Sequence, residues 1–174
     1  MKLEFIYPED RFDVHFTLPT AAYEKIWNED SDRIKQAFKN YTGLTFQQKI
    51  IKVKVYDGVS MSGTSRKPMR LNTQNRTLTT KRFALIHELG HRLLSENMLS
   101  ALHQNDDERS DDEHRRLSLF ESDVFLELYG KDAHKEWLSI LEHGDTKTFE
   151  YLSSLSFGER QEKLRHLIAT NELR

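Results

Sequence analysis

The sequence has no cysteine among its 174 residues, and this absence removes several kinds of chemistry at once. Disulfides, thiolate metal ligands and cysteine nucleophiles are all excluded. Any metal site in this chain must therefore be built from histidine and carboxylate side chains.

Long apolar runs are also missing. No stretch of about 18 apolar residues occurs, so the sequence predicts no transmembrane helix. The first ten residues, MKLEFIYPED, lack the apolar core of a signal peptide. We therefore expect a cytoplasmic protein without membrane partners.

A strong overall charge is lacking as well. The formal net charge is -2 at pH 7, which gives no overall argument for binding nucleic acid or membranes. The length favours one domain, 1–174, with a core of useful size.

What the sequence does contain is an HExxH motif, formed by His87, Glu88 and His91. On a helix, His87 and His91 lie one turn apart on the same face and can bind one Zn²⁺ together. Glu88 is rotated by about 100° from His87, which puts its carboxylate beside the metal. There it can act as the general base toward water that the metal has acidified. The motif predicts metal-assisted hydrolysis of an amide bond.

The setting of the motif is apolar, which predicts a buried helix. Burying two imidazoles and a carboxylate without a metal would cost on the order of several kcal/mol. The flanking apolar residues are Phe83, Leu85, Ile86, Leu89, Leu93 and Leu94.

Periodicity predicts the elements before the motif. We expect a strand over 2–7, a helix over 20–41 that ends at Gly43, and a strand over 51–55 with one wet face. A second strand over 68–72 would lie at a sheet edge, because Pro68 cannot donate to a neighbour. Residues 68–73 would then either hold an extended substrate by strand addition or form a plain hairpin arm. After the motif, helical patterns cover 113–129, 132–142, 147–155 and 157–172.

A catalytic zinc site needs a third protein ligand. Leu94 and Asn97 stand where a metzincin would have glycine and histidine, so that class is excluded. The remaining candidates are His103, Glu113, His114, Glu121 and Asp123.

Helical geometry and burial narrow these candidates. Glu113, His114 and Glu121 lie near the apolar stripe of the 113–129 helix, whereas Asp123 is about 120° away and suits a role in holding a ligand histidine. Burial favours Glu121, which is in mid-helix, over Glu113 at the acidic helix start. A site of two histidines and one carboxylate also accepts divalent ions other than zinc.

The segment KRFALIHELGHRLL, residues 81–94, resembles the R-F-T-L-A-H-E-L-G-H-x-L-L helix of ImmA/IrrE-type zinc metallopeptidases, a gluzincin-like family. In that family an E-x-x-A-x-x-F-A helix supplies the third ligand. The similar stretch here is 121–128, with Val124 at the small-residue position and Glu127 in place of phenylalanine. The resemblance implies that His87, His91 and Glu121 bind the metal and that Glu88 is catalytic.

The resemblance also implies a fold and a function. We expect an α+β, zincin-like domain, mostly helical, with a short antiparallel sheet next to the HExxH helix. Residues 1–78 would form the N-terminal helix and sheet, 79–130 the metal-binding helices and 131–174 the C-terminal helices. The implied function is an intracellular zinc-dependent metallopeptidase acting on a protein partner, in the family often a DNA-binding regulator or a component of a phage or toxin–antitoxin pair. His114 and Tyr129 are candidates for stabilising the oxyanion.

Two alternatives have support in the sequence. Residues 49–82 carry nine basic side chains against one acid, Asp57, which would suit a SprT-like protease that acts at DNA and uses His103 or His114 as third ligand. Such a run is also typical of a solvated sheet face. The second alternative is a non-catalytic interaction protein on a zincin scaffold.

Overall fold

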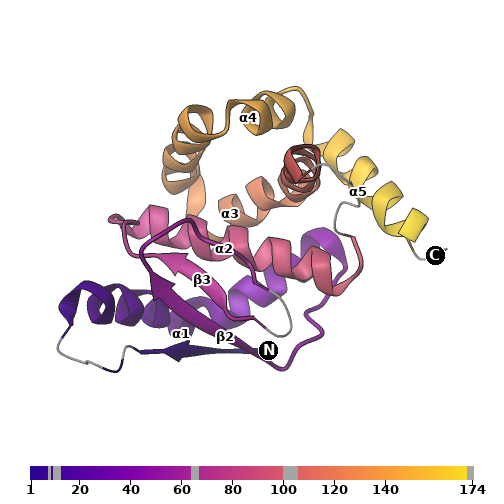
Figure 1. Ribbon diagram of the computed structural model, residues 1–174. Coiled ribbons are helices and arrows are strands. Elements are labelled where there is room, and N and C mark those ends of the chain that lie inside the picture. Colours follow the sequence, from indigo (N-terminus) through magenta and orange to yellow (C-terminus); the bar gives the residue numbers. More distant parts are fainter. Residues whose placement is uncertain (8, 10–12, 64–66, 100–105, 172–174) are drawn as a thin grey trace.

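The computed structural model describes residues 1–7, 9, 13–63, 67–99 and 106–171. Strands and helices alternate at the N-terminal end, and the remainder is helical (Figure 1). In chain order the elements are β1 (Lys2–Ile6), α1 (Val14–Thr42), β2 (Ile50–Tyr56), β3 (Met69–Asn72), α2 (Leu78–Glu96), α3 (Asp106–Gly144), α4 (Thr146–Ser153) and α5 (Phe157–Asn171). The α+β class is therefore confirmed in outline.

The sheet is parallel, so the expectation of an antiparallel sheet is wrong. Its strand order is β1-β2-β3, with Leu3 opposite Ile51 and Val53 opposite Met69. Helix α1 connects β1 to β2 as a crossover, which is the connection that parallel neighbours require. Among the described residues, one isolated antiparallel bridge joins Met61 to Arg70. The Asp57-Gly58 turn therefore starts a segment that returns along the edge of β3.

Helix α1 forms one continuous element. It begins after Asp13, whose side chain accepts from the backbone N–H of His15, so it starts earlier than periodicity predicts. Gly43 ends it in the left-handed conformation, with φ of 71°, and donates to Lys39. This is the expected glycine stop.

Helices cover one face of the sheet and leave the other to solvent. Ile51, Val53 and Val55 of β2 are buried, in alternation with exposed residues. Helix α1 packs on β1 and β2, and α2 packs on β3. The outer face carries Lys52, Lys54 and Arg70, all exposed. Three of the nine basic residues of the 49–82 run thus lie on a solvated sheet face.

Helix α2 lies between the sheet and the C-terminal helices (Figure 1). Helix α3 packs against α1, α2, α4 and α5, and buried hydrophobic residues from Leu3 to Leu164 form one core cluster. Gly130 interrupts α3 with φ of 79° and ψ of 178°, so α3 consists of two helical segments, as the separate patterns predict. Within the described residues, no helix is long and apolar enough to span a membrane.

Candidate metal centre

Helix α2 supplies the first part of the site. Its start is fixed by a capping box, in which the Thr77 side chain accepts from the backbone of Thr80 and the Thr80 side chain bonds back to Thr77. From that start the helix continues unbroken to Glu96 and carries the HExxH motif. The helical prediction for the motif is confirmed.

Three histidines converge in the structure. The rings of His87 and His91 are 4.7 Å apart, and each lies 5.3 Å from the ring of His114. One nitrogen from each ring lies within 4.8 Å of the others, and this is the one group of potential metal ligands found among the described residues. Helix α3 thus contributes a histidine to the pair on α2.

The nitrogen geometry suits a tetrahedral ion. The Nε2 atoms of His87 and His91 are 3.1 Å apart. Two imidazole nitrogens bound to one tetrahedral Zn²⁺ at about 2.0–2.1 Å would be about 3.3 Å apart. Imidazole is also a donor that zinc prefers. The three histidines therefore fit a zinc ion in donor type and number, and the His87–His91 pair fits it in spacing.

Glu121 lies outside this group of nitrogens. Its Oε1 atom is 3.1 Å from Nδ1 of His87, the ring nitrogen that does not face His91. Its side chain is 5% exposed, so mid-helix burial is as expected. A ligand would direct its oxygen to the same centre as Nε2 of His87, whereas the Glu121 carboxylate contacts Nδ1, the other nitrogen of that ring. A carboxylate in that position fixes the ring and leaves Nε2 free for a metal.

Close packing of α3 on α2 brings these side chains together. A Cβ atom added at Gly90 would collide with the side chain of Leu117. The glycine of the motif therefore lets α3 approach α2 at this point. His114, Leu117 and Glu121 are spaced by three and four residues and share one face of α3. His114 and Glu121 therefore lie on either side of Leu117 and face α2, and helical geometry predicts this orientation for both.

Electrostatics couple His87 to the carboxylates around it. Burial by itself would lower the pKa of His87, but the charge and hydrogen bond of Glu121, with Glu88 and Asp145, raise it to about 9. Burial raises the pKa of Glu88 to about 7, although His87 opposes the shift. A carboxylate with a pKa near neutrality is suited to exchange protons at physiological pH.

The other two imidazoles are held neutral. Burial lowers the pKa of His91 well below its usual value, and the charges of His87 and His114 add to the effect. Burial also lowers the pKa of His114, with a further contribution from His87. Neutral imidazoles are the form that binds metals.

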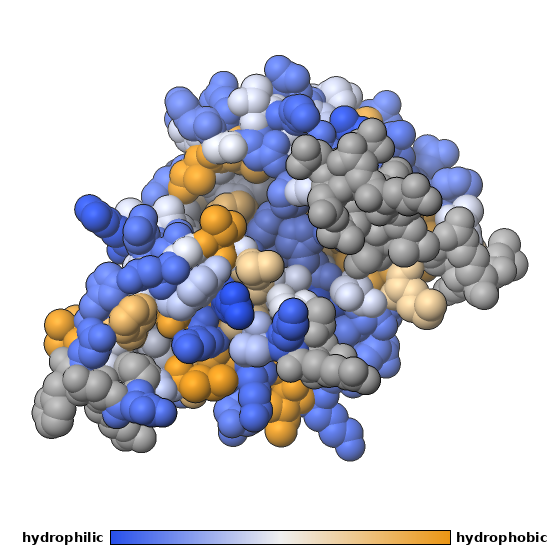
Figure 2. Space-filling view, viewed as in Figure 1, coloured by the Kyte–Doolittle hydropathy of each residue, from blue (hydrophilic) through white to orange (hydrophobic). Residues whose placement is uncertain are grey.

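A cleft of about 730 Å³ opens over the histidines. The segment 59–63, together with Asn75, Phe83 and Glu88, contributes to its walls. Figure 2, in the same view as Figure 1, shows the surface hollowed between the upper helices and the lower part of the molecule, with hydrophobic side chains at the rim. Val59 and Met61 are 80% and 53% exposed, so apolar side chains are available there.

The edge of β3 is partly covered. The backbone N–H and carbonyl of Arg70 bond to Met61 at 2.8 and 2.9 Å, and the N–H of Asn72 donates to the Ser60 hydroxyl. β3 is an edge strand, as Pro68 predicts, but these groups are already paired. The segment 59–63 therefore lies between β3 and the cleft.

The other candidate residues that the structure describes lie outside the group of three histidines. Glu113 lines the cleft, outside the histidine group. Asp123 pairs with Arg160 at 2.7 Å and does not contact a histidine of the group. Tyr129 lies under the guanidinium of Arg82 and is not among the cleft residues. His103 falls outside the described residues.

One carboxylate that sequence reasoning missed lies at the site. Asp145 Oδ2 is 3.3 Å from Nδ1 of His114. Its position before Thr146 marks it as a helix N-cap, but that pattern does not indicate which side chain it meets. Only the packing of α4 against α3 reveals the contact.

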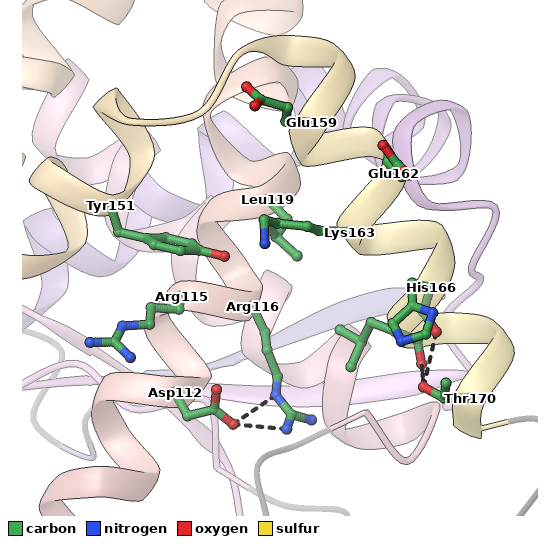
Figure 3. Close-up of a pocket in the computed structure, with 11 residues that line it drawn as sticks. Asp112, Arg115, Arg116, Leu119, Tyr151, Glu159, Glu162, Lys163, His166 and Thr170 are labelled. Carbon is green, nitrogen blue, oxygen red and sulfur yellow. Dashed lines mark hydrogen bonds and ion pairs between the residues drawn. The ribbon is translucent and has the colours of Figure 1, made fainter.

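A second cavity of about 620 Å³ lies between α3, α4 and α5. Figure 3 shows Arg116 paired with Asp112 there, and Tyr151 and Lys163 on its walls. Glu159 also lines the cavity, and its carboxylate accepts from the backbone N–H of Ser156, the residue that precedes α5. None of the three histidines lines this cavity, and its charges compensate one another.

Comparison of the chain with protein-family models, with curated proteins and with solved structures gives no match. The arguments for function therefore come from the residues of the site.

Proposed function

We propose that this protein is a zinc-dependent metallopeptidase that hydrolyses a peptide bond in a protein partner. The observation that carries the proposal is the convergence of three imidazoles beside the buried carboxylate of Glu88, at the floor of one cleft. His87, His91 and His114 would hold the ion. Glu121 would orient His87 rather than bind the metal.

A zinc ion in this place would polarise the scissile carbonyl and acidify a water molecule. Glu88 removes a proton from that water as its oxygen attacks the carbonyl carbon. When the carbon–nitrogen bond breaks, Glu88 returns the proton to the leaving amine. Because it lies one residue from His87 on the same helix, this carboxylate can both take the proton and return it.

The substrate would lie along residues 59–63. The backbone N–H and carbonyl of Met61 both bond to Arg70 of β3. In an extended segment the backbone N–H and carbonyl groups of the neighbouring Ser60 and Ser62 point the opposite way, away from β3. Val59 and Met61 offer apolar contacts at the same rim. These features support an extended peptide with apolar side chains near the cleaved bond.

Replacement of Glu88 by glutamine tests this mechanism. Glu88→Gln should retain zinc and lose hydrolysis of unfolded casein by about 10²–10⁴-fold, because it removes the proton acceptor alone. Glu113→Gln is the matched control, since Glu113 lines the same cleft and should be dispensable. Zinc is measured by equilibrium dialysis. A wild-type protein that binds no zinc, or an active Glu88→Gln protein, would reject the proposal.

The position of His114 favours a second candidate, a SprT-like protease that acts at DNA. In that group the third ligand is a histidine, whereas the ImmA/IrrE-type resemblance implies Glu121. The exposed Lys52, Lys54 and Arg70 would supply phosphate contacts. Retention on duplex DNA that weakens steeply with salt would support this candidate, and no retention at low salt would remove it.

A further inference from the structure

Two of the three histidines have a carboxylate behind the ring. Glu121 contacts Nδ1 of His87 at 3.1 Å, and Asp145 contacts Nδ1 of His114 at 3.3 Å. Nε2 of His87 faces His91, and Nε2 of His114 is the ring nitrogen that has no carboxylate against it. The two contacts use the same atom of the ring but come from different elements.

Such a contact decides which nitrogen carries the proton. Glu121 is hydrogen-bonded to Nδ1 of His87, whereas Asp145 makes a charge contact with Nδ1 of His114. A negative charge beside Nδ1 favours a proton on that nitrogen, so each neutral ring keeps its lone pair on Nε2. This arrangement also fixes the orientation of the ring and raises the basicity of the ligand. Without the carboxylate, His114 would be able to adopt the opposite tautomer, in which Nε2 carries a proton and cannot bind a metal.

Asp145 is itself held in place. It caps α4, accepting from the backbone N–H of Thr148 at 3.1 Å and from its hydroxyl at 2.7 Å. The neighbouring Lys147 pairs with Asp111 of α3 at 2.8 Å. The carboxylate is thus fixed by the first turn of α4, and that turn is fastened to the helix that carries His114.

The path of the chain explains how Asp145 reaches His114. After His114 the first segment of α3 leads the chain away from the site, and the second segment leads it back to Asp145. Gly130 connects the segments in a conformation, φ 79° and ψ 178°, that is essentially restricted to glycine. The contact therefore depends on the C-terminal helices.

We propose that Asp145 is a positioning residue that holds His114 in the tautomer and orientation needed to bind the metal, so that docking of α4 completes the metal centre. This inference rests on the proposed metal site. It assigns to the C-terminal helices a role that their sequence does not indicate.

Asp145→Asn is the informative variant. Asparagine caps helices as well as aspartate does. Its amide N–H₂ would face Nδ1 of His114, which favours the Nε2–H tautomer. Asp32→Asn is the matched control, because it makes the same chemical change at an exposed carboxylate of α1 whose partner is Lys35 and which contacts no histidine. Both proteins and the wild type are titrated with Co²⁺, followed by its visible absorption, and with Zn²⁺ in competition.

We expect Asp145→Asn to bind both ions about 10–100-fold more weakly, the usual effect of losing a partner behind a ligand. Asp32→Asn should bind as the wild type does. Nitrogen-15 NMR of the metal-free proteins should show the Nδ1–H tautomer of His114 in the wild type and the Nε2–H tautomer in Asp145→Asn. A merely structural role for Asp145 would not change the tautomer.

Equal affinity and an identical cobalt spectrum in Asp145→Asn would overturn the inference and leave the metal site standing. Failure of the wild type to bind either ion would overturn the proposed function and this inference with it. If Asp145→Asn does not fold, Asp145→Ser decides the question. Serine also caps helices but is too short to hold the imidazole, so unchanged affinity there would equally reject the role.

Discussion

The two halves of the candidate metal centre are built in different ways. The α2 half consists of His87, Glu88 and His91, which one turn of a single helix places together. The α3–α4 half consists of His114 and Asp145, which meet only because two helices pack. The side chain of His87 is 21% exposed, whereas the side chains of His114 and Asp145 are 30% and 34% exposed.

This difference separates what helical geometry guarantees from what packing must supply. The α2 half persists wherever the helix forms, because its spacing is local. The α3–α4 half depends on contacts between residues far apart in the sequence, in a partly solvated place. We therefore expect the second half to be the more easily weakened, and the predictions below test that ranking by metal affinity.

Loss of a ligand should have the largest effect. His91→Ala and His114→Ala should each reduce zinc affinity by more than the roughly 10–100-fold typical of a residue behind a ligand. Isothermal titration with zinc measures both. Similar losses in the two variants would show that α3 contributes a full ligand. If His114→Ala binds zinc as tightly as the wild type, His114 is not a ligand and only the α2 half binds the metal.

Glu121→Gln should have a smaller effect, about 10–100-fold in zinc affinity, because the residue acts through His87. Its Oε1 atom contacts Nδ1 of that ring, and glutamine keeps the size of the side chain. The same titration gives the result. A loss as large as that in His91→Ala would restore Glu121 as a ligand, as the resemblance implies.

The sequence predicts the α2 half well for a physical reason. HExxH spacing, the apolar surroundings and helical period all lie within one element, so no long-range information is needed. The same applies to the Gly43 stop and to the capping box of Ser156 and Glu159, which α5 retains.

The rest of the site depends on information that periodicity does not hold. Helical angles put both His114 and Glu121 toward α2, and burial then favours Glu121 as a ligand. A buried carboxylate is equally well accommodated behind a protonated ring nitrogen, and only the three-dimensional position of Glu121, beside Nδ1 of His87, distinguishes the two roles. The parallel sheet was missed for a similar reason, since strand alternation carries no direction.

Metal affinity should also depend on pH, with opposite signs for binding and for stability. His87 has a pKa of about 9 in the metal-free fold, above its ordinary value of 6.5. Its pairing with Glu121 therefore stabilises the metal-free fold below pH 6.5, and this contribution is lost as pH rises through about 9. Zinc must displace that proton, so its affinity should rise over the same range by up to about tenfold per pH unit.

Urea unfolding with a chelator present and zinc titration, both at pH 7, 8 and 9, measure the two trends. His87→Gln removes the titrating group and is the reference for the stability series. Stability and affinity that change in the same direction would show that Glu121 does not hold a proton on His87.

The smallest effect on the metal centre is expected from α5, although its effect on stability is large. Arg160 holds Asp123 through two nitrogens, at 2.7 and 3.3 Å, and both side chains are nearly buried. Arg160→Leu leaves Asp123 without its partner and should lower the free energy of unfolding by about 3–5 kcal/mol. Arg165→Leu, on an exposed face of α5, should change it by less than about 0.5 kcal/mol.

At temperatures where Arg160→Leu is folded, its zinc affinity should equal that of the wild type, because α5 supplies neither a ligand nor a carboxylate to the site. A fall in affinity would mean that the docking of α4, and with it Asp145, depends on α5, and the dependence of the α3–α4 half on packing would then extend to the whole C-terminal region.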